Sequence, residues 1–485
     1  MSSGRHDIDM VQVARRVLQE NGFATAFPPG IESSIPADDP MEAARDMREH
    51  PWSSIDNDDS LDLDQIELAE DLGGDAIRVL VGIADVDALV PKGSPIDRAA
   101  AANTCSLYTG FHIFPMLPTV LSTGRTSLLA DAHERLAVVT EMVVLGDGTV
   151  DHARTAVYLA RVQNRAKLAY GKVGAWLEDA GAPPTGGETI GHQIRLQDRA
   201  AQRLRAARHQ HGALELETIE ARAVVEGGHV VDLEIQHKNR AKELVEDLMI
   251  AANGATAKYL EGRGLSSIRR VVSVPKRWDR IVELAASLGC TLPAEPDGKA
   301  LADFLAARKR ADGDAFAELS LSVVKLIGPG EYALQRAIDP DRGHFGLAVE
   351  DYAHSTAPNR RYPDLVTQRL LKAATTGKPP PYSDDELAQI AAHCTERENA
   401  ARKVERTMRK IAAAELLSTR IGQTFPAIIT GVTPKGTFAR LLHPPAEGRI
   451  VRGERGLDVG DHVHVKLIAT EPERGFIDFA RENGP

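Results

Sequence analysis

The segment Ile55–Gln65 constrains this chain more than any other, because it places five aspartates within nine residues. Like charges at this density repel one another unless they are well solvated or share a cation. If the segment is extended, Asp62 and Asp64 project to one face, and the two leucines beside them project to the other. With Asp56 entering from a preceding turn, these carboxylates form the oxygen-rich environment that suits magnesium. The pattern therefore predicts a magnesium site built from Asp56, Asp62 and Asp64.

Two other interpretations of the acidic segment compete with a magnesium site. The first is a solvated acidic turn, which is the general alternative for any run of acids. The second is a calcium loop, because oxygen-bearing side chains recur at alternate positions from Asp56 and Glu67 falls at position twelve. However, Leu61 occupies position six, where a glycine is needed, and Pro51 interrupts any helix that would enter the loop. The calcium loop is therefore rejected.

Composition sets broader limits on the chain. Its 485 residues predict two or more domains, and 43% apolar and 26% charged residues are ordinary for a globular protein. No apolar stretch approaches the roughly 18 residues that span a bilayer, and the first residues lack a secretory signal, so we expect a cytoplasmic protein with no membrane association. The three cysteines are far apart and none lies in a C-x-x-C pair, which excludes a disulfide framework and a structural zinc site. The net charge of −11 argues mildly against nucleic-acid binding, unless the acids gather in a metal site and the bases line a groove.

Residues 1–45 form a short segment that is expected to be largely helical. Apolar spacing predicts an amphipathic helix over 7–22 that ends at Gly22, and a second short helix over 41–49. A proline-rich stretch separates the two. The segment is interpreted as a docked arm or as an accessory unit resembling a helix-turn-helix.

Residues 46–418 mix strands with long helices in a segregated order that predicts an α+β fold. Strand patterns cover 76–83, 136–145 and 150–160, and a hairpin pattern covers 214–225 and 229–236 around Gly227 and Gly228. Helical periodicity covers 165–178, 189–209, 239–263, 276–288, 297–311, 314–326, 361–376 and 385–417.

Residues 419–485 change character again. Five short strand patterns are separated by glycines, which predicts a small closed barrel of the OB type. Such barrels commonly hold single-stranded nucleic acid.

Three blocks of the sequence, in this order, carry a specific resemblance. They are Ile55–Gln65, Tyr108–Pro118 and Tyr352–Asp364. Together they resemble the ribonuclease II (RNB) family, and the likeness covers roughly residues 50–376 and the C-terminal barrel. The resemblance implies an RNB catalytic domain, and a hydrolytic exoribonuclease that threads single-stranded RNA 3′ end first and releases nucleoside 5′-monophosphates.

The resemblance also implies roles for single residues. Asp56, Asp62 and Asp64 match three of the family's four metal-site aspartates, and Arg360 matches an arginine at the scissile phosphate. Of these residues, Asp62, Asp64 and Arg360 are the implied catalytic groups. The remaining matches are RNA contacts: Tyr108 packs on the terminal base, Tyr170 and Glu246 favour ribose through its 2′-hydroxyl, and Tyr362 and Glu405 are further candidates.

This chain departs from the family pattern at several points. The fourth aspartate is replaced by Gln65, a further candidate metal ligand that keeps an oxygen but loses a charge; Asp58 or Asp59 is a candidate to compensate. The aromatic residue expected near 214–216 is absent, and Ser355, Ala357 and Asn359 differ from the usual pattern. The short helical segment stands where bacterial members usually carry cold-shock domains.

The sequence therefore predicts a processive 3′→5′ exoribonuclease that acts by metal-assisted hydrolysis with one or two Mg²⁺ ions, for which Mn²⁺ can substitute. Its products are nucleoside 5′-monophosphates and a short end product, and the expected protein is a monomer that needs no protein partner. The basic side chains expected to line the RNA path are Arg161, Arg165, Lys167, Lys238 and Arg240. The alternative is a catalytically impaired RNA-binding relative, which Gln65 keeps open.

Overall fold

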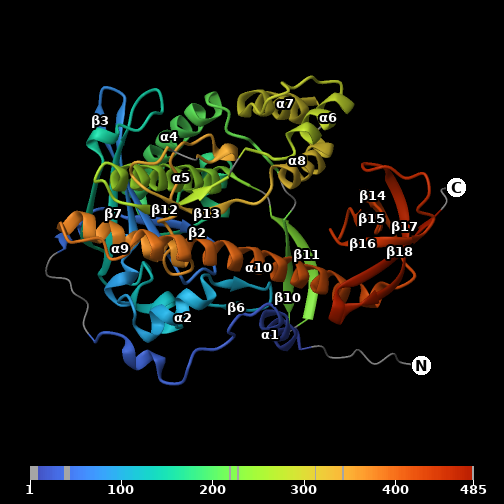
Figure 1. Cartoon of the computed structure of the whole chain (residues 1–485), viewed down its shortest axis with the longest axis horizontal. Helices are drawn as coiled ribbons and strands as arrows, with labels where there is room; N and C mark the ends of the chain where they lie inside the picture. Colours follow the sequence, from blue (N-terminus) through green and yellow to red (C-terminus); the bar gives the residue numbers. More distant parts are fainter. Residues whose placement is uncertain are drawn as a thin grey trace.

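The structure, a computed structural model, describes residues 9–37, 44–217, 220–226, 229–236, 238–272, 274–311, 313–340 and 343–482. A seven-stranded mixed sheet with the order β1-β8-β7-β4-β3-β2-β9 lies at one end of the molecule (Figure 1). Its strands are β1 Arg45–Asp46, β2 Ser53–Asp56, β3 Gln65–Gly73, β4 Ala76–Ala84, β7 Arg135–Val144, β8 Ala156–Val162 and β9 Ala166–Ala169. The β1–β8 and β2–β9 pairs are parallel and the others antiparallel. Because β2 lies beside β3, Asp56 and Gln65 end up at neighbouring strand ends.

Helices cover both faces of this sheet, which explains why β4 is almost continuously apolar and buried. One face packs on α3 Tyr170–Leu177, α4 Gly187–Gln210 and α5 Arg240–Glu261. The other face packs on α2 Pro95–Asn103, α9 Tyr362–Thr376 and the first turns of α10 Asp384–Leu417. Burying apolar side chains on both faces contributes about 25 cal/mol per Å² to the stability of the fold.

The helix α10 connects the sheet to the C-terminal barrel (Figure 1). Ser383 starts it with a capping box, in which its hydroxyl accepts from the Glu386 backbone N–H and the Glu386 carboxylate accepts from the Ser383 N–H. At about 1.5 Å per residue, its 34 residues extend roughly 50 Å. Along this length it contacts α1 Met10–Glu20, the hairpin β10 Glu220–Glu226 and β11 His229–Gln236, and the pair β12 Ser267–Val271 and β13 Glu331–Gln335.

The last strands form the closed barrel that the sequence predicts. They are β14 Thr424–Thr433, β15 Gly436–Leu441, β16 Glu447–Arg452, β17 His462–Glu471 and β18 Phe476–Glu482, in the order β14-β15-β16-β18-β17. Gly448 is required where β16 crosses the barrel core, because a Cβ there would lie 2.5 Å from a ring carbon of Phe479. The expected α+β fold with a C-terminal OB-type barrel is confirmed.

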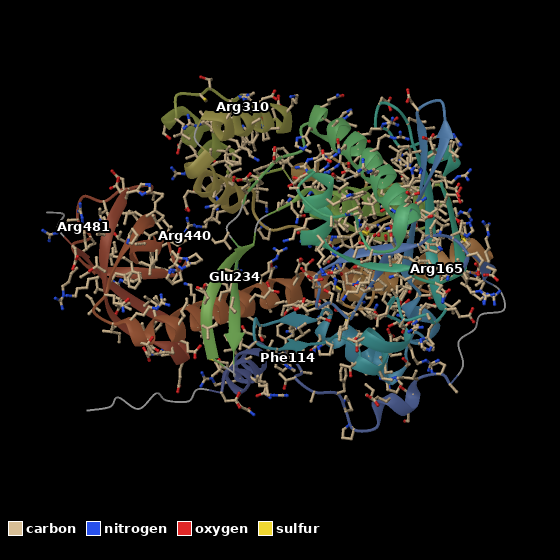
Figure 2. All side chains as sticks on the ribbon, turned by 180° about the vertical axis from the view of Figure 1, so that it is seen from behind. Phe114, Arg165, Glu234, Arg310, Arg440 and Arg481 are labelled. Carbon is tan, nitrogen blue, oxygen red and sulfur yellow. The ribbon has the colours of Figure 1, made fainter. Side chains whose placement is uncertain are left out.

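A helical cluster lies beside the barrel and has a core of its own. It consists of α6 Trp278–Ser287, α7 Gly298–Ala311 and α8 Gly313–Ile327. Figure 2 shows Arg440 on the barrel, where it forms an ion pair with Glu318 of α8. The barrel and the helical cluster are therefore joined by a charged contact.

Some local expectations were wrong. Residues 41–49 were expected to be helical, but the described part is the short strand β1, which pairs with Ala160 and Arg161, followed by a turn. The expected helix over 165–178 begins instead as strand β9, and α3 starts at Tyr170. Between β7 and β8, residues 152–154 form a 3₁₀ turn, so β8 starts at Ala156. The expected turn at Gly227 and Gly228 lies outside the described residues.

Candidate active site

The loop that connects β2 to β3 carries the aspartates. Leu63 fixes its inner side, because this side chain is fully buried in the core and its backbone N–H donates to Ser127 Oγ at 2.9 Å. Ser127 in turn donates to the Leu61 carbonyl at 2.6 Å. The expected alternation holds only in part: Leu63 is buried, but the Leu61 side chain is 56% exposed. Asp62 and Asp64 flank the buried leucine.

Asp64 lies against the segment that precedes α9. Its side chain is 2% exposed and accepts from the Asn359 backbone N–H at 2.9 Å and from Arg360 Nε at 3.3 Å. Burial raises the pKa of Asp64 to about 7, while Arg360 and the Asn359 N–H oppose the rise. The structure therefore brings together two of the predicted catalytic residues, which lie almost 300 positions apart in the sequence.

Asp364 holds Arg360 and its neighbours in place. This carboxylate is fully buried in the first turn of α9 and accepts from the Ala357 N–H at 2.8 Å and from Arg361 Nη2 at 2.7 Å. The Arg360 carbonyl accepts from the Ser106 N–H at 3.0 Å, just before the hairpin that carries Tyr108. The sequence singled out Asn359 only as a departure, yet its backbone N–H contacts the catalytic carboxylate and its Oδ1 accepts from Thr126 at 2.6 Å.

Tyr108 completes this group from a third segment. It lies on β5 Leu107–Tyr108, which pairs with β6 Ile113–Phe114, and its hydroxyl is within hydrogen-bonding reach of Asp62 and Arg360. Burial raises the pKa of Asp62, and the charge of Asp56 adds to the rise. The side of the hairpin away from Asp62 packs on α1, where Arg15 lies 5.4 Å from the Phe114 ring centre. The N-terminal helix thus supports the hairpin from behind.

Tyr170 lies beside the aspartate loop at the end of β9. It follows β9, whose last residue Ala169 pairs with Asp56, and the charges of Asp56 and Glu67 act on its hydroxyl. The Tyr170 carbonyl accepts from Asn239, the residue that caps α5, at 3.0 Å. This contact joins α3 to the start of α5. About two turns further along α5, Glu246 forms an ion pair with Lys238 at 2.8 Å.

The structure places other predicted residues differently. Tyr362 is 5% exposed in the core and hydrogen-bonds to Asp97, so this tyrosine does not face the site and is corrected to a structural residue. Glu405 lies on α10, where its charge acts on the Cys105 thiol. Asp58 and Asp59 are exposed, and Asp58 lies 3.8 Å from Lys172, so the structure gives no support to either as a replacement for the charge that Gln65 lacks.

The basic residues that were expected to line an RNA path already have partners within the chain. Lys167 donates to the carbonyls of Asp58 and Ser60 at 2.8 and 2.6 Å, which makes it a support of the aspartate loop. Arg240 binds both carboxylate oxygens of Asp198. Arg161, Arg165 and Lys238 form ion pairs with nearby acids.

Glu67 is a buried acid close to the aspartate loop, and sequence reasoning considered it only as position twelve of a calcium loop. It lies on β3, two residues after Gln65, and is 0% exposed. Burial raises the pKa of Glu67 to about 8, and the charge of Asp56 adds to the rise. A second sequence signal is its spacing from Gln65, which alternation places on the same face of the strand.

The donor set suits a hard cation. Asp56, Asp62, Asp64 and Gln65 offer oxygen only, and the mutual repulsion of the acids would be relieved by a positive ion. Among the described residues, no three His, Cys, Asp or Glu side chains converge as a closed metal cage. Mg²⁺ needs no such cage, because it keeps several waters and commonly takes one or two carboxylates together with substrate phosphates.

Comparisons with known proteins agree with this geometry. A model of the RNB domain matches residues 44–377, and a model of the RNase II-type exonuclease C-terminal S1 domain matches residues 423–482. Ribonuclease R of Escherichia coli strain K12 is 30% identical over an alignment of 493 positions. The alignment covers 93% of this chain and 59% of that protein. The chain therefore spans little more than half the length of this curated relative.

Solved structures share the fold. RNase R of Mycoplasma genitalium, in complex with ribose-methylated single-stranded RNA, superposes with a TM-score of 0.89 at 22% identity, covering 98% of this chain and 78% of that one. Yeast Ssd1, described as a pseudonuclease, superposes with a TM-score of 0.70 at 16% identity, covering 95% and 57%. In the part of the chain that the structure describes, no helix is long and apolar enough to cross a membrane. Since the RNB model matches well over half of its residues, the chain belongs to the RNB-domain family.

Proposed function

We propose that this chain is a magnesium-dependent exoribonuclease that degrades single-stranded RNA processively from its 3′ end to nucleoside 5′-monophosphates and a short end product. The observation that carries the proposal is the convergence of Asp62, Asp64, Tyr108 and Arg360 from three distant segments. Acids, a guanidinium and an aromatic ring in one place suit the reacting end of an RNA strand. We further propose that the protein acts as a cytoplasmic monomer without a protein partner.

Asp56, Asp62, Asp64 and Gln65 are the residues proposed to hold the metal, and the family is generally dependent on divalent metals. When bound, Mg²⁺, or Mn²⁺ in its place, supplies positive charge at the phosphate and makes water a better nucleophile. The buried side chain of Leu63, which lies between Asp62 and Asp64, holds these two aspartates in place. The backbone that carries them is anchored within the chain, because the Leu63 N–H donates to Ser127 and the Leu63 carbonyl accepts from the Leu128 N–H.

Arg360 is proposed to act on the phosphate itself. Its guanidinium contacts Asp64 through Nε, so its remaining N–H groups are left to face a phosphate oxygen. As charge develops on that oxygen during hydrolysis, fixed N–H donors stabilise it without having to reorganise. Arg361 does not compete for this role, because its guanidinium binds the buried Asp364.

Tyr108, Tyr170 and Glu246 are proposed to position the terminal nucleotides. The Tyr108 side chain is 38% exposed, which leaves its ring face open for a base to stack upon. Tyr170 and Glu246 flank the junction of α3 and α5 and are proposed to recognise the ribose 2′-hydroxyl. Glu246 first has to exchange its partner Lys238 for the sugar. Glu405, which lies near the start of the Tyr108 hairpin, is proposed only as a support for it.

A second function, RNA binding without cleavage, is favoured by one observation. Gln65 brings no charge to the metal site, and the fold is shared by a protein described as a pseudonuclease. The two functions differ in a single property, which is the breaking of a phosphodiester bond.

The products of uniformly labelled RNA, separated by thin-layer chromatography, test the proposal. The expected products are nucleoside 5′-monophosphates that appear without added inorganic phosphate, while DNA of the same sequence remains intact. Nucleoside 3′-monophosphates, or release that requires phosphate, would contradict the proposed hydrolysis. Intact RNA in a sample that binds it tightly would support the second function.

A further inference from the structure

Glu67 is a buried acid without a partner. It is 0% exposed, and neither of its carboxylate oxygens has a hydrogen-bond partner among the described residues. Ser53 lies directly opposite on β2, is also 0% exposed, and its hydroxyl oxygen likewise has no partner. Three unsatisfied oxygen atoms therefore lie at the same point of the sheet. Buried polar groups are almost always satisfied, so this point requires an explanation.

The other buried acids near the site show what is missing at Glu67. Asp64 receives a backbone N–H and Arg360, and Asp364 receives a backbone N–H and Arg361. No basic side chain is among the groups that act on Glu67, and the charge that does act on it is that of Asp56. A fully buried carboxylate that lacks a counter-charge and feels the charge of a second carboxylate is strongly unfavourable. A bound cation would remove both problems.

The position of Glu67 connects it to the aspartate loop. Alternation along β3 places Glu67 on the same face as Gln65, the neutral residue at the entrance of the strand. Asp56 ends the strand that carries Ser53, the residue opposite Glu67, and pairs with Ala169 next to Tyr170; the charges of Glu67 and Asp56 both act on the Tyr170 hydroxyl. Asp58 and Asp59, the other acids of the loop, are exposed.

We propose that Glu67 is a metal-site residue, which together with Asp56 holds a divalent cation at the inner end of the aspartate loop. The carboxylate oxygens of Glu67 and Asp56 and the hydroxyl oxygen of Ser53 are the kind of donor that such an ion prefers. The charge that Gln65 does not supply is then provided two residues further along the same strand face. This inference rests on the proposed metal-dependent function and deepens it.

Mn²⁺ binding in the absence of RNA tests the inference directly. Titrations followed by electron paramagnetic resonance compare the wild-type chain with Glu67→Gln, which keeps the shape of the side chain and removes its charge. The matched control is Glu70→Gln, because Glu70 lies on the same strand, faces the other way and pairs with Arg78. Loss of a residue that supports a metal site typically weakens affinity 10–100-fold. We expect Glu67→Gln to bind Mn²⁺ at least about tenfold more weakly and Glu70→Gln to match the wild type. Equal affinities in the wild type and Glu67→Gln overturn the inference.

A second pair of measurements keeps the test informative if the single variant is altered in stability. The double variant Gln65→Asp with Glu67→Gln returns one charge to the same strand face, so its Mn²⁺ affinity should recover toward that of the wild type. Thermal unfolding should show a smaller Mn²⁺-induced rise in Tm for Glu67→Gln than for the wild type. An equal rise contradicts the inference.

RNA cleavage separates this inference from the proposed function. If the wild type degrades RNA and Glu67→Gln binds Mn²⁺ as tightly as the wild type, the proposed function is supported and the inference about Glu67 is wrong. A wild type that binds Mn²⁺ through Glu67 but cleaves no RNA retains the inference and removes the function.

Discussion

At the scale of single residues, the proposed chemical role of Arg360 can be tested most directly. Replacing Arg360 by Lys retains a positive charge but loses the planar set of N–H donors. We expect the single-turnover cleavage rate to fall by about 10²–10³-fold, because one fixed donor to the developing charge is lost. RNA affinity, measured by fluorescence anisotropy, should change far less.

The control for this prediction is Arg409→Lys, an equivalent change at an exposed position of α10. It should cleave RNA at the wild-type rate. If Arg360→Lys weakens RNA binding and leaves the single-turnover rate unchanged, then Arg360 serves binding and has no part in the reaction.

The sequence was sufficient to predict which motif residues come together, but it did not predict the residues that surround them. Asp62, Asp64, Tyr108 and Arg360 were expected together, and the structure brings them together. Glu67 was not expected, because an acid in an alternating strand usually faces water. Its burial follows from α3, α4 and α5 covering that face, a tertiary fact that no local pattern contains. The burial of Tyr362 was not predicted for the same reason, since only the packing of α9 places this side chain in the core.

At the scale of elements, the segment before α9 owes its shape to a row of aromatic rings. His344, Tyr352, His354 and Tyr332 follow one another with ring centres 5.5–5.6 Å apart. The Tyr332 hydroxyl lies 2.8 Å from His354 Nδ1, and His344 Nδ1 accepts from the Leu347 N–H at 3.2 Å. Both histidines therefore have hydrogen-bonding partners within this segment and its neighbours. Arg270 and Arg361 lie on the same row and oppose any added positive charge.

This row predicts a loss of stability in mild acid. Burial lowers the pKa of His344 to about 4, so the folded protein keeps its ring neutral where the unfolded chain binds a proton. The contribution is present above pH 6.5 and is lost as the pH falls toward 4. Between pH 7 and 5 the free energy of unfolding should fall by about 2 kcal/mol from this residue alone. Urea unfolding of the wild type and of His344→Gln at pH 7 and pH 5 measures this fall in the free energy of unfolding. An equal fall in the two proteins would contradict the prediction.

Element boundaries show where local patterns stop being informative. Long helices such as α4, α5 and α10 were expected nearly as they are, because their periodicity is sustained over many turns. The strands β1 and β9 were mistaken for helix because each gains its backbone partners from a distant strand, β8 and β2 respectively. The five barrel strands were recognised because glycines mark each turn.

At the scale of the whole molecule, the barrel, the helical cluster and the sheet are tied together by α10 and by the ion pair between Arg440 and Glu318 (Figures 1 and 2). The net charge of −11 is compatible with RNA binding because many acids are already paired with bases or gathered in the aspartate loop.

The most direct test of the account is the degradation of 5′-labelled poly(A) by the wild type and by Asp64→Asn, in magnesium and in EDTA. Asp58→Asn, at an exposed position of the same loop, is the matched control. The account predicts that magnesium allows the wild type and Asp58→Asn to convert full-length RNA to a short end product without a ladder of intermediates. EDTA and Asp64→Asn should each abolish this conversion. Intact poly(A) in every lane, with RNA still bound tightly, would contradict the account and identify the chain as a binding protein without the chemistry.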